Sequence, residues 1–148
     1  MQLAKSTNNL YVSYKRALKV KTDTSSEQEK TILLIDDEEM VINVSEMMLN
    51  RLGYKVLKAH CGNEGLKLFE ENKLKIDLII SDLEMPEMNG KEVMDKIREI
   101  DPQIKVMLSS GALTDADEKS VMNRGFNGFI KKPYNLNTLC KKMAEIMN

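Results

Sequence analysis

The sequence predicts an α/β fold, in which helices cover both faces of a five-stranded parallel sheet. Short runs of leucine and β-branched residues alternate with segments whose apolar residues recur every three or four positions. The runs at 32–35 and 78–80 are apolar throughout, which is typical of strands buried on both faces. Five such alternations imply right-handed crossovers and a doubly wound sheet.

The first strand and helix are predicted over residues 31–36 and 40–52. The strand is an apolar run that ends at two aspartates. The helix ends at Gly53, since glycine adopts the left-handed conformation that closes many helices. The apolar residues that share one face of this helix are Val41, Val44, Met48 and Leu52.

The remaining elements follow the same alternation. Further strands are predicted at 54–59, 78–82, 105–109 and 126–130, and further helices at 63–71, 91–100, 115–124 and from residue 136 onward. Pro102 follows the third helix and Gly125 follows the fourth, and neither residue favours continuing a helix. The last helix is marked by the spacing of Leu136, Leu139, Met143 and Ile146.

Composition limits the class of protein. A chain of 148 residues fits one ordinary domain with a short extension. A net charge of −1 gives no electrostatic reason to expect nucleic acid as a direct partner, and no apolar run approaches the ~20 residues of a membrane span. Cys61 and Cys140 lack metal-site spacing and indicate reduced thiols. We therefore expect a cytoplasmic protein without direct membrane contact.

Residues 1–30 differ from the rest of the chain. Basic residues outnumber acidic ones there, and residues 22–30 are polar, as in a linker. Leu10, Tyr14 and Leu18 would share a face of a short helix, whereas residues 11–14 would also suit a strand, and an unstructured arm is the third possibility. We expect an N-terminal arm or linker over 1–30 and one domain over 31–148.

Charged residues close three of the predicted strands. Asp36 and Asp37 follow the first strand, Asp82 ends the third, and Lys132 follows the fifth. Ligands bind at the carboxyl ends of parallel strands, so these acids converge if the first and third strands are neighbours. Three such carboxylates repel one another unless a cation neutralises them, and oxygen ligands favour Mg²⁺. The alternative, that Asp36, Asp37 and Glu38 only cap the following helix, leaves Asp82 unexplained.

A lysine and a hydroxyl group would complete a site for a phosphoryl group. Lys132 offers a compact positive charge, and Pro133 turns the chain after the fifth strand. Ser109 and Ser110 end the fourth strand, and either hydroxyl could donate to a phosphoryl oxygen. A solvated lysine and ordinary turn serines are the simpler alternatives.

Over residues 31–148 the chain resembles the receiver domain of two-component response regulators. The matching motifs, in chain order, are Asp36-Asp37, Asp82-x-x-Met85-Pro86-x-Met88-x-Gly90, Ser110-Gly111 and Lys132-Pro133. Residues 108–111 and 127–130 look most like the receivers of hybrid sensor histidine kinases. The resemblance implies a flavodoxin-like (βα)5 fold with strand order 2-1-3-4-5.

The resemblance also implies a phosphoacceptor and its metal ligands. Asp82 would accept the phosphoryl group and form an acyl phosphate. Mg²⁺ would be held by Asp82, by Asp37 directly, by Asp36 mainly through water, and by the backbone carbonyl of Glu84. The side chain of Glu84 would also place a carboxylate near the phosphoryl group.

A switch is implied as well. Ser110 and Lys132 would bind the phosphoryl group, and the Lys132–Pro133 peptide bond would be cis. Ser110 would move toward the phosphoryl group and Phe129 would turn inward, which would change the surface of the fourth helix, fifth strand and fifth helix. Phe129 is often tyrosine in this family, so we expect a stronger inward bias here.

The implied phosphodonor is a histidine kinase or a histidine phosphotransfer protein, since the single histidine, His60, is interpreted as a solvated loop residue. The output partner is an unknown protein, and a phosphorylation-dependent homodimer stays open. The chain would catalyse only its own phosphorylation, either alone or as the receiver end of a hybrid kinase. Two alternatives are a haloacid-dehalogenase-like phosphohydrolase, for which the chain lacks room for a cap domain, and a non-phosphorylated adaptor with the receiver fold.

Overall fold

A computed structural model describes residues 29–148, so nearly all of the arm predicted over residues 1–30 lies outside the described residues. The strands are β1 (Thr31–Ile35), β2 (Lys55–Ala59), β3 (Ile76–Asp82), β4 (Lys105–Ser110) and β5 (Gly128–Lys131). The helices are α2 (Glu39–Arg51), α3 (Gly62–Asn72), α4 (Gly90–Ile100), α5 (Asp115–Asn123) and α6 (Leu136–Met147). The strands are parallel and form one sheet in the order β2-β1-β3-β4-β5, which confirms the predicted fold class and strand order.

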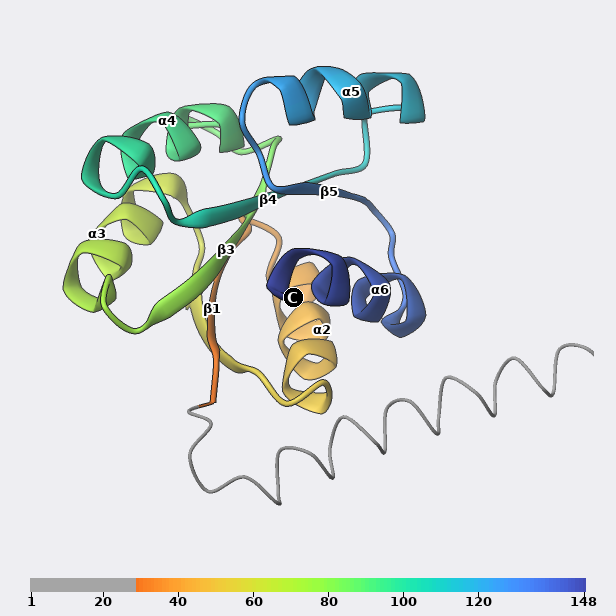
Figure 1. The fold of residues 1–148 in the computed structure, drawn as a ribbon, viewed down its shortest axis with the longest axis horizontal. Coiled ribbons are helices and arrows are strands. Elements are labelled where there is room, and N and C mark those ends of the chain that lie inside the picture. The colour runs from red at the N-terminus through yellow and green to blue at the C-terminus, as the bar shows by residue number, and fades with distance from the viewer. Residues whose placement is uncertain (1–28) are drawn as a thin grey trace, which may run out of the picture.

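The sheet lies between two helical layers. Helices α2 and α6 cover one face, and α3, α4 and α5 cover the other (Figure 1). Successive residues of a strand point to opposite faces. Ile32 and Leu34 of β1 therefore pack with the α2–α6 layer, while Leu33 and Ile35 pack with the opposite layer. This double burial is the reason that the central strands are apolar runs rather than alternating patterns.

Two strands start two residues away from the predicted position. β3 begins at Ile76, before the exposed Asp77, whose carboxylate accepts a hydrogen bond from the Thr31 amide at 2.8 Å. β5 begins at Gly128 instead of residue 126. Asn127 lies beside β4 without being part of a strand, because its side chain accepts from the Val106 amide at 2.9 Å. In both places a side chain does what a backbone group does in a regular ladder.

The apolar face predicted for α2 is only partly correct. The buried residues of this helix are Ile42, Ser45 and Leu49, whereas Val44 is 49% exposed. Met48 is half-buried at the edge of the α2–α6 core. The helix is thus apolar on part of its outer side as well, which makes periodicity a poor guide to its orientation.

Within the part of the chain that the structure describes, none of the helices combines the length and the apolar character needed to cross a membrane.

Candidate functional site

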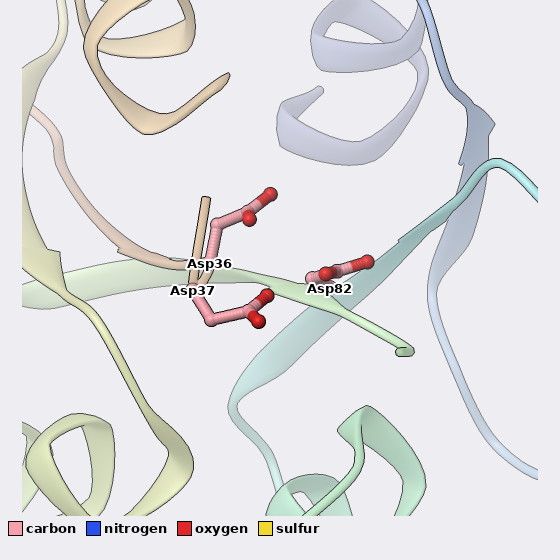
Figure 2. A group of neighbouring side chains, drawn as sticks. All are labelled: Asp36, Asp37 and Asp82. Atoms are coloured by element: carbon pink, nitrogen blue, oxygen red, sulfur yellow. The ribbon is translucent and has the colours of Figure 1, made fainter. Parts of the chain in front are cut away.

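Three acidic side chains meet at the carboxyl edge of the sheet. β1 and β3 are hydrogen-bonded neighbours, so Asp36 and Asp37, just after β1, lie beside Asp82 at the end of β3 (Figure 2). One carboxylate oxygen of each residue lies within 4.8 Å of the others. Asp36 and Asp82 are buried, at 3% and 1% exposure, while Asp37 is exposed. The condition set by the sequence, that the first and third strands are adjacent, is met.

Lys132 supplies positive charge to this cluster. Its Nζ lies 2.7 Å from Asp36 Oδ2 and 3.1 Å from Asp82 Oδ1. Burial by itself lowers the pKa of this lysine, but the hydrogen bond and charge of Asp36, together with Asp82, raise the pKa above its ordinary value. Lys132 is therefore an ammonium group at neutral pH. The Lys132–Pro133 peptide bond is cis.

Asp82 differs from an ordinary carboxylate. Burial raises its pKa to about 7, and the charges of Asp36 and Glu84 add to this effect, while Lys132 opposes it. Although Lys132 is close, Asp82 Oδ1 is buried and accepts no hydrogen bond from residues 29–148. An additional cation would favour the ionised form of this side chain.

The donor set fits Mg²⁺. It consists of carboxylate oxygens, which suit a hard cation, and it includes one buried oxygen that lacks a hydrogen-bond donor. Both oxygens of Asp36 are already engaged, because Oδ1 accepts from the Glu38 amide at 2.9 Å and Oδ2 pairs with Lys132. Asp82 and the exposed Asp37 are therefore the carboxylates best suited to direct ligation.

The loop after β3 packs closely against β4 and against the start of α4. The Leu83 amide donates to the Ser109 carbonyl at 2.8 Å, and the Gly90 amide donates to the Leu83 carbonyl at 3.1 Å. A Cβ atom at Gly90 would lie 2.5 Å from the backbone oxygen of Asp82, so only glycine allows α4 to begin this close. The backbone around Asp82 is consequently held on two sides.

Of the two candidate serines, Ser110 contacts this loop through its side chain. Its hydroxyl donates to the carboxylate of Glu84 and accepts from the amides of Ala112 and Leu113 at 3.1 and 3.3 Å. Ser109 is paired with Asp82 in the sheet register. The sequence placed Glu84 near the site but contained no signal for its bond to Ser110.

Phe129 lies next to this region in the core. It is 3% exposed and packs among the residues that join α3, α4 and α5 to the sheet.

A groove that sequence reasoning missed runs beside the site. It has a volume of about 540 Å³ and lies between the first turns of α2 and the loop after β5. Its lining includes Met40, Val41, Val44, Met48 and Tyr134, with Glu84 and Lys132 at the end nearest the acids. The groove thus extends to Lys132, whose ammonium group contacts Asp36 and Asp82.

Comparison with known proteins assigns this chain to a protein family. The family model of the response regulator receiver domain matches residues 32–144. The chain belongs to this family. Receiver domains are signalling domains of two-component systems, which confirms the resemblance read from the motifs.

The relatives include receivers of hybrid sensor kinases. The chain is 33% identical over 121 residues to the autoinducer 1 sensor kinase/phosphatase LuxN of Vibrio campbellii, and 33% identical over 129 residues to the sensor kinase CckA of Brucella abortus. These matches cover 82% and 87% of this chain but only 14% of either kinase. The receiver domain therefore spans a small fraction of the curated kinases it matches.

Solved structures agree with this assignment. The crystal structure of the receiver domain from the hybrid histidine kinase CckA is 34% identical, with a TM-score of 0.67, over 80% of this chain and 99% of that one. A response regulator receiver domain protein from Clostridium thermocellum is 29% identical, with a TM-score of 0.74, over 80% of this chain and 94% of that chain.

Proposed function

We propose that this receiver domain is a phosphoacceptor of a two-component phosphorelay, with Asp82 as the residue phosphorylated in a Mg²⁺-dependent reaction. The observation that carries the proposal is the arrangement around Asp82: a buried carboxylate whose Oδ1 lies 3.1 Å from the Lys132 ammonium, next to Asp36 and Asp37. This set provides both a nucleophile and positive charge for a phosphoryl group.

The proposed reaction needs little covalent machinery. A carboxylate oxygen of Asp82 attacks phosphorus, the bond from phosphorus to the donor histidine nitrogen breaks, and the imidazole leaves with the bonding electron pair. Lys132 faces the acceptor and would pair with a phosphoryl oxygen, while Asp37 and the Glu84 carbonyl would hold the metal. Bound Mg²⁺ would neutralise charge on the phosphoryl oxygens.

Phosphorylation would then act as a switch. The new group adds up to two negative charges at the sheet edge. Ser110 would leave its present partners to donate to it, and Phe129 would fill the space behind Ser110. We propose that the surface formed by α5, β5 and α6 changes as a consequence and contacts the output partner. If phosphorylation causes dimerisation, this partner is a second copy of the domain.

The groove beside α2 supports a protein phosphodonor. A phosphohistidine on a helix must bring its phosphoryl group to Asp82, and the apolar groove ends at Lys132, which contacts this residue. A histidine kinase or a histidine phosphotransfer protein would dock its helix here. The hybrid sensor kinases among the relatives support such a partner, and a cytoplasmic location accompanies this proposal.

The domain boundary is part of the same proposal. The family match begins at residue 32, next to the predicted boundary at residue 31. Residues 1–30 would then be an arm or the link to another domain of a longer kinase. Neither arrangement changes the chemistry at Asp82.

Intact mass after incubation with Mg²⁺ and acetyl phosphate tests the proposal, with Asp82→Asn in parallel. We expect one hydroxylamine-labile phosphoryl group on the wild type and none on the variant. If the wild type stays unmodified while it binds Mg²⁺, the domain does not phosphorylate itself from a small donor, and either an adaptor with the receiver fold or a relay that strictly requires its partner protein replaces the proposal.

A further inference from the structure

The hydroxyl group of Ser110 already uses all of its hydrogen-bonding capacity on Glu84, Ala112 and Leu113. A serine hydroxyl has one proton to donate and two lone pairs. Ser110 donates this proton to the carboxylate of Glu84 and accepts from the amides of Ala112 and Leu113. The same proton cannot be donated to a phosphoryl oxygen at the same time.

Glu84 is well placed to hold this bond. It lies on the loop after β3, whose backbone is tied to β4 by the bond from Leu83 to Ser109 and to the start of α4 by the bond from Gly90 to Leu83. Ser110 is fully buried, so water does not reach its hydroxyl, whereas the Glu84 residue itself is exposed. Bonds to charged acceptors are stronger than those between neutral groups.

The bond also extends to the next helix. Ala112 and Leu113 precede Thr114, the N-cap of α5, which forms a capping box with Asp117. When Ser110 moves, it must release the two amides as well as Glu84. The position of this hydroxyl is therefore linked to the conformation of the segment that leads into α5.

We infer that the Glu84 carboxylate latches Ser110 in its unphosphorylated position and so opposes the switch. The inference rests on the proposed phosphorylation of Asp82. Glu84 is a positioning residue in this account: its side chain acts through Ser110, and its effect is lost when Ser110 has no hydroxyl group. Removal of the carboxylate therefore favours the state in which Ser110 faces the phosphoryl group.

A simpler effect of Glu84 must be separated from the latch. A carboxylate near the site also repels a phosphoryl group, whether or not Ser110 is present. A double-mutant cycle distinguishes the two, because only the latch requires the hydroxyl. The probe is beryllofluoride with Mg²⁺, a phosphoryl analogue, and its affinity is measured for the wild type, Glu84→Ala, Ser110→Ala and the double variant.

The latch predicts that Glu84→Ala binds beryllofluoride about tenfold more tightly than the wild type, and that this gain falls to about twofold or less in the Ser110→Ala background. The backbone carbonyl of residue 84, a proposed metal ligand, is kept in both variants. Glu87→Ala is the matched control, since it removes an exposed acid from the same loop. An equal gain in both backgrounds, or no gain, overturns the latch. A wild type that does not bind the analogue instead overturns the proposed function itself.

A second measurement needs no phosphoryl analogue on the variant. In ¹H–¹⁵N spectra of the free proteins, Glu84→Ala should move the amide signals of Ala112 and Leu113 toward the positions they have in the beryllofluoride-bound wild type. The control Glu87→Ala should leave them in place. Unmoved signals in Glu84→Ala show that the carboxylate does not determine the position of Ser110, and the inference then fails.

Discussion

The hydroxyl groups of Ser45 and Tyr134 lie 2.6 Å apart and connect α2 to the loop after β5. Ser45 is 2% exposed, so it depends on a protein partner for its hydrogen bond. Tyr134 follows Lys132 by two residues and lines the groove beside α2. This one hydrogen bond thus fixes the loop after β5, which carries Lys132, to helix α2, which forms one wall of the groove.

Tyr134→Phe should lower the free energy of unfolding by about 1 to 2 kcal/mol, because it leaves the buried Ser45 hydroxyl without this partner. Urea denaturation measures the loss. Ser45→Ala combined with Tyr134→Phe should cost less than the sum of the two single changes. Strict additivity would show that the two hydroxyl groups do not stabilise each other.

The stability of the domain without metal should depend on pH through Asp82. Its folded-state pKa of about 7 exceeds the ordinary value of 3.8, so the folded protein holds a proton that the unfolded chain loses between these values. Stability therefore falls as pH rises from about 4 to 7. Asp82→Asn removes this cost, and its advantage over the wild type should grow by about 3 kcal/mol between pH 4.5 and 8 in EDTA. Asp95→Asn, at an exposed ion pair, should show no such trend.

Mg²⁺ should stabilise the folded domain through Asp37. At ten times its dissociation constant, an ion that binds only the folded state adds about 1.4 kcal/mol. Thermal unfolding with and without Mg²⁺ should show this increase for the wild type and for Glu87→Gln. Asp37→Asn should lose it, and a full increase in that variant would remove Asp37 from the ligand set.

Gly90→Ala should destabilise the domain more than Gly111→Ala does. The added methyl group at residue 90 meets backbone that cannot move away, whereas at residue 111 the nearest atom is 3.8 Å away. We expect a loss of about 2 to 3 kcal/mol for the first change and under about 1 kcal/mol for the second, by chemical denaturation. Equal losses would mean that the loop after β3 adapts to the extra atom.

Val44→Asn should slow phosphoryl transfer from a histidine phosphotransfer protein that phosphorylates the wild type, by about tenfold, without slowing phosphorylation by acetyl phosphate. The side chain is half exposed on the groove, so its loss acts on docking more than on folding. Leu74→Asn, which is 96% exposed outside the groove, is the matched control. A similar slowing with both donors would place the defect in the chemistry at Asp82.

The fold and the edge of the sheet could be predicted because their signals are local. An apolar run that ends in Asp36 or Asp82 identifies both a buried strand and its carboxyl end, and parallel pairing then brings the acids together. The neighbouring Ser109 and Ser110 could not be distinguished in this way, because both are buried. The contacts that the Ser110 hydroxyl makes with Glu84 and with the amides of Ala112 and Leu113 are not visible in the local sequence.

Other features depend on residues far apart in the sequence. Ser45 and Tyr134 are separated by 89 positions, and nothing near Ser45 indicates that it faces the core. The orientation of α2 was harder still, since Val44 is apolar and exposed while Ser45 is polar and buried. The apolar periodicity predicts a buried face for α2 that is rotated by about one residue from the face that is buried. A groove lined by the exposed apolar residues cannot be predicted from that face.

The ion pairs of Lys132 have a consequence for how the domain is assembled. Since the ammonium group touches both Asp36 and Asp82, the folded chain carries its own counterion at the point where negative charge is most concentrated. The sheet can therefore form whether or not divalent cations are available. In the proposed function, Mg²⁺ then determines when the domain is competent to react, and it adds stability to a domain that folds without it.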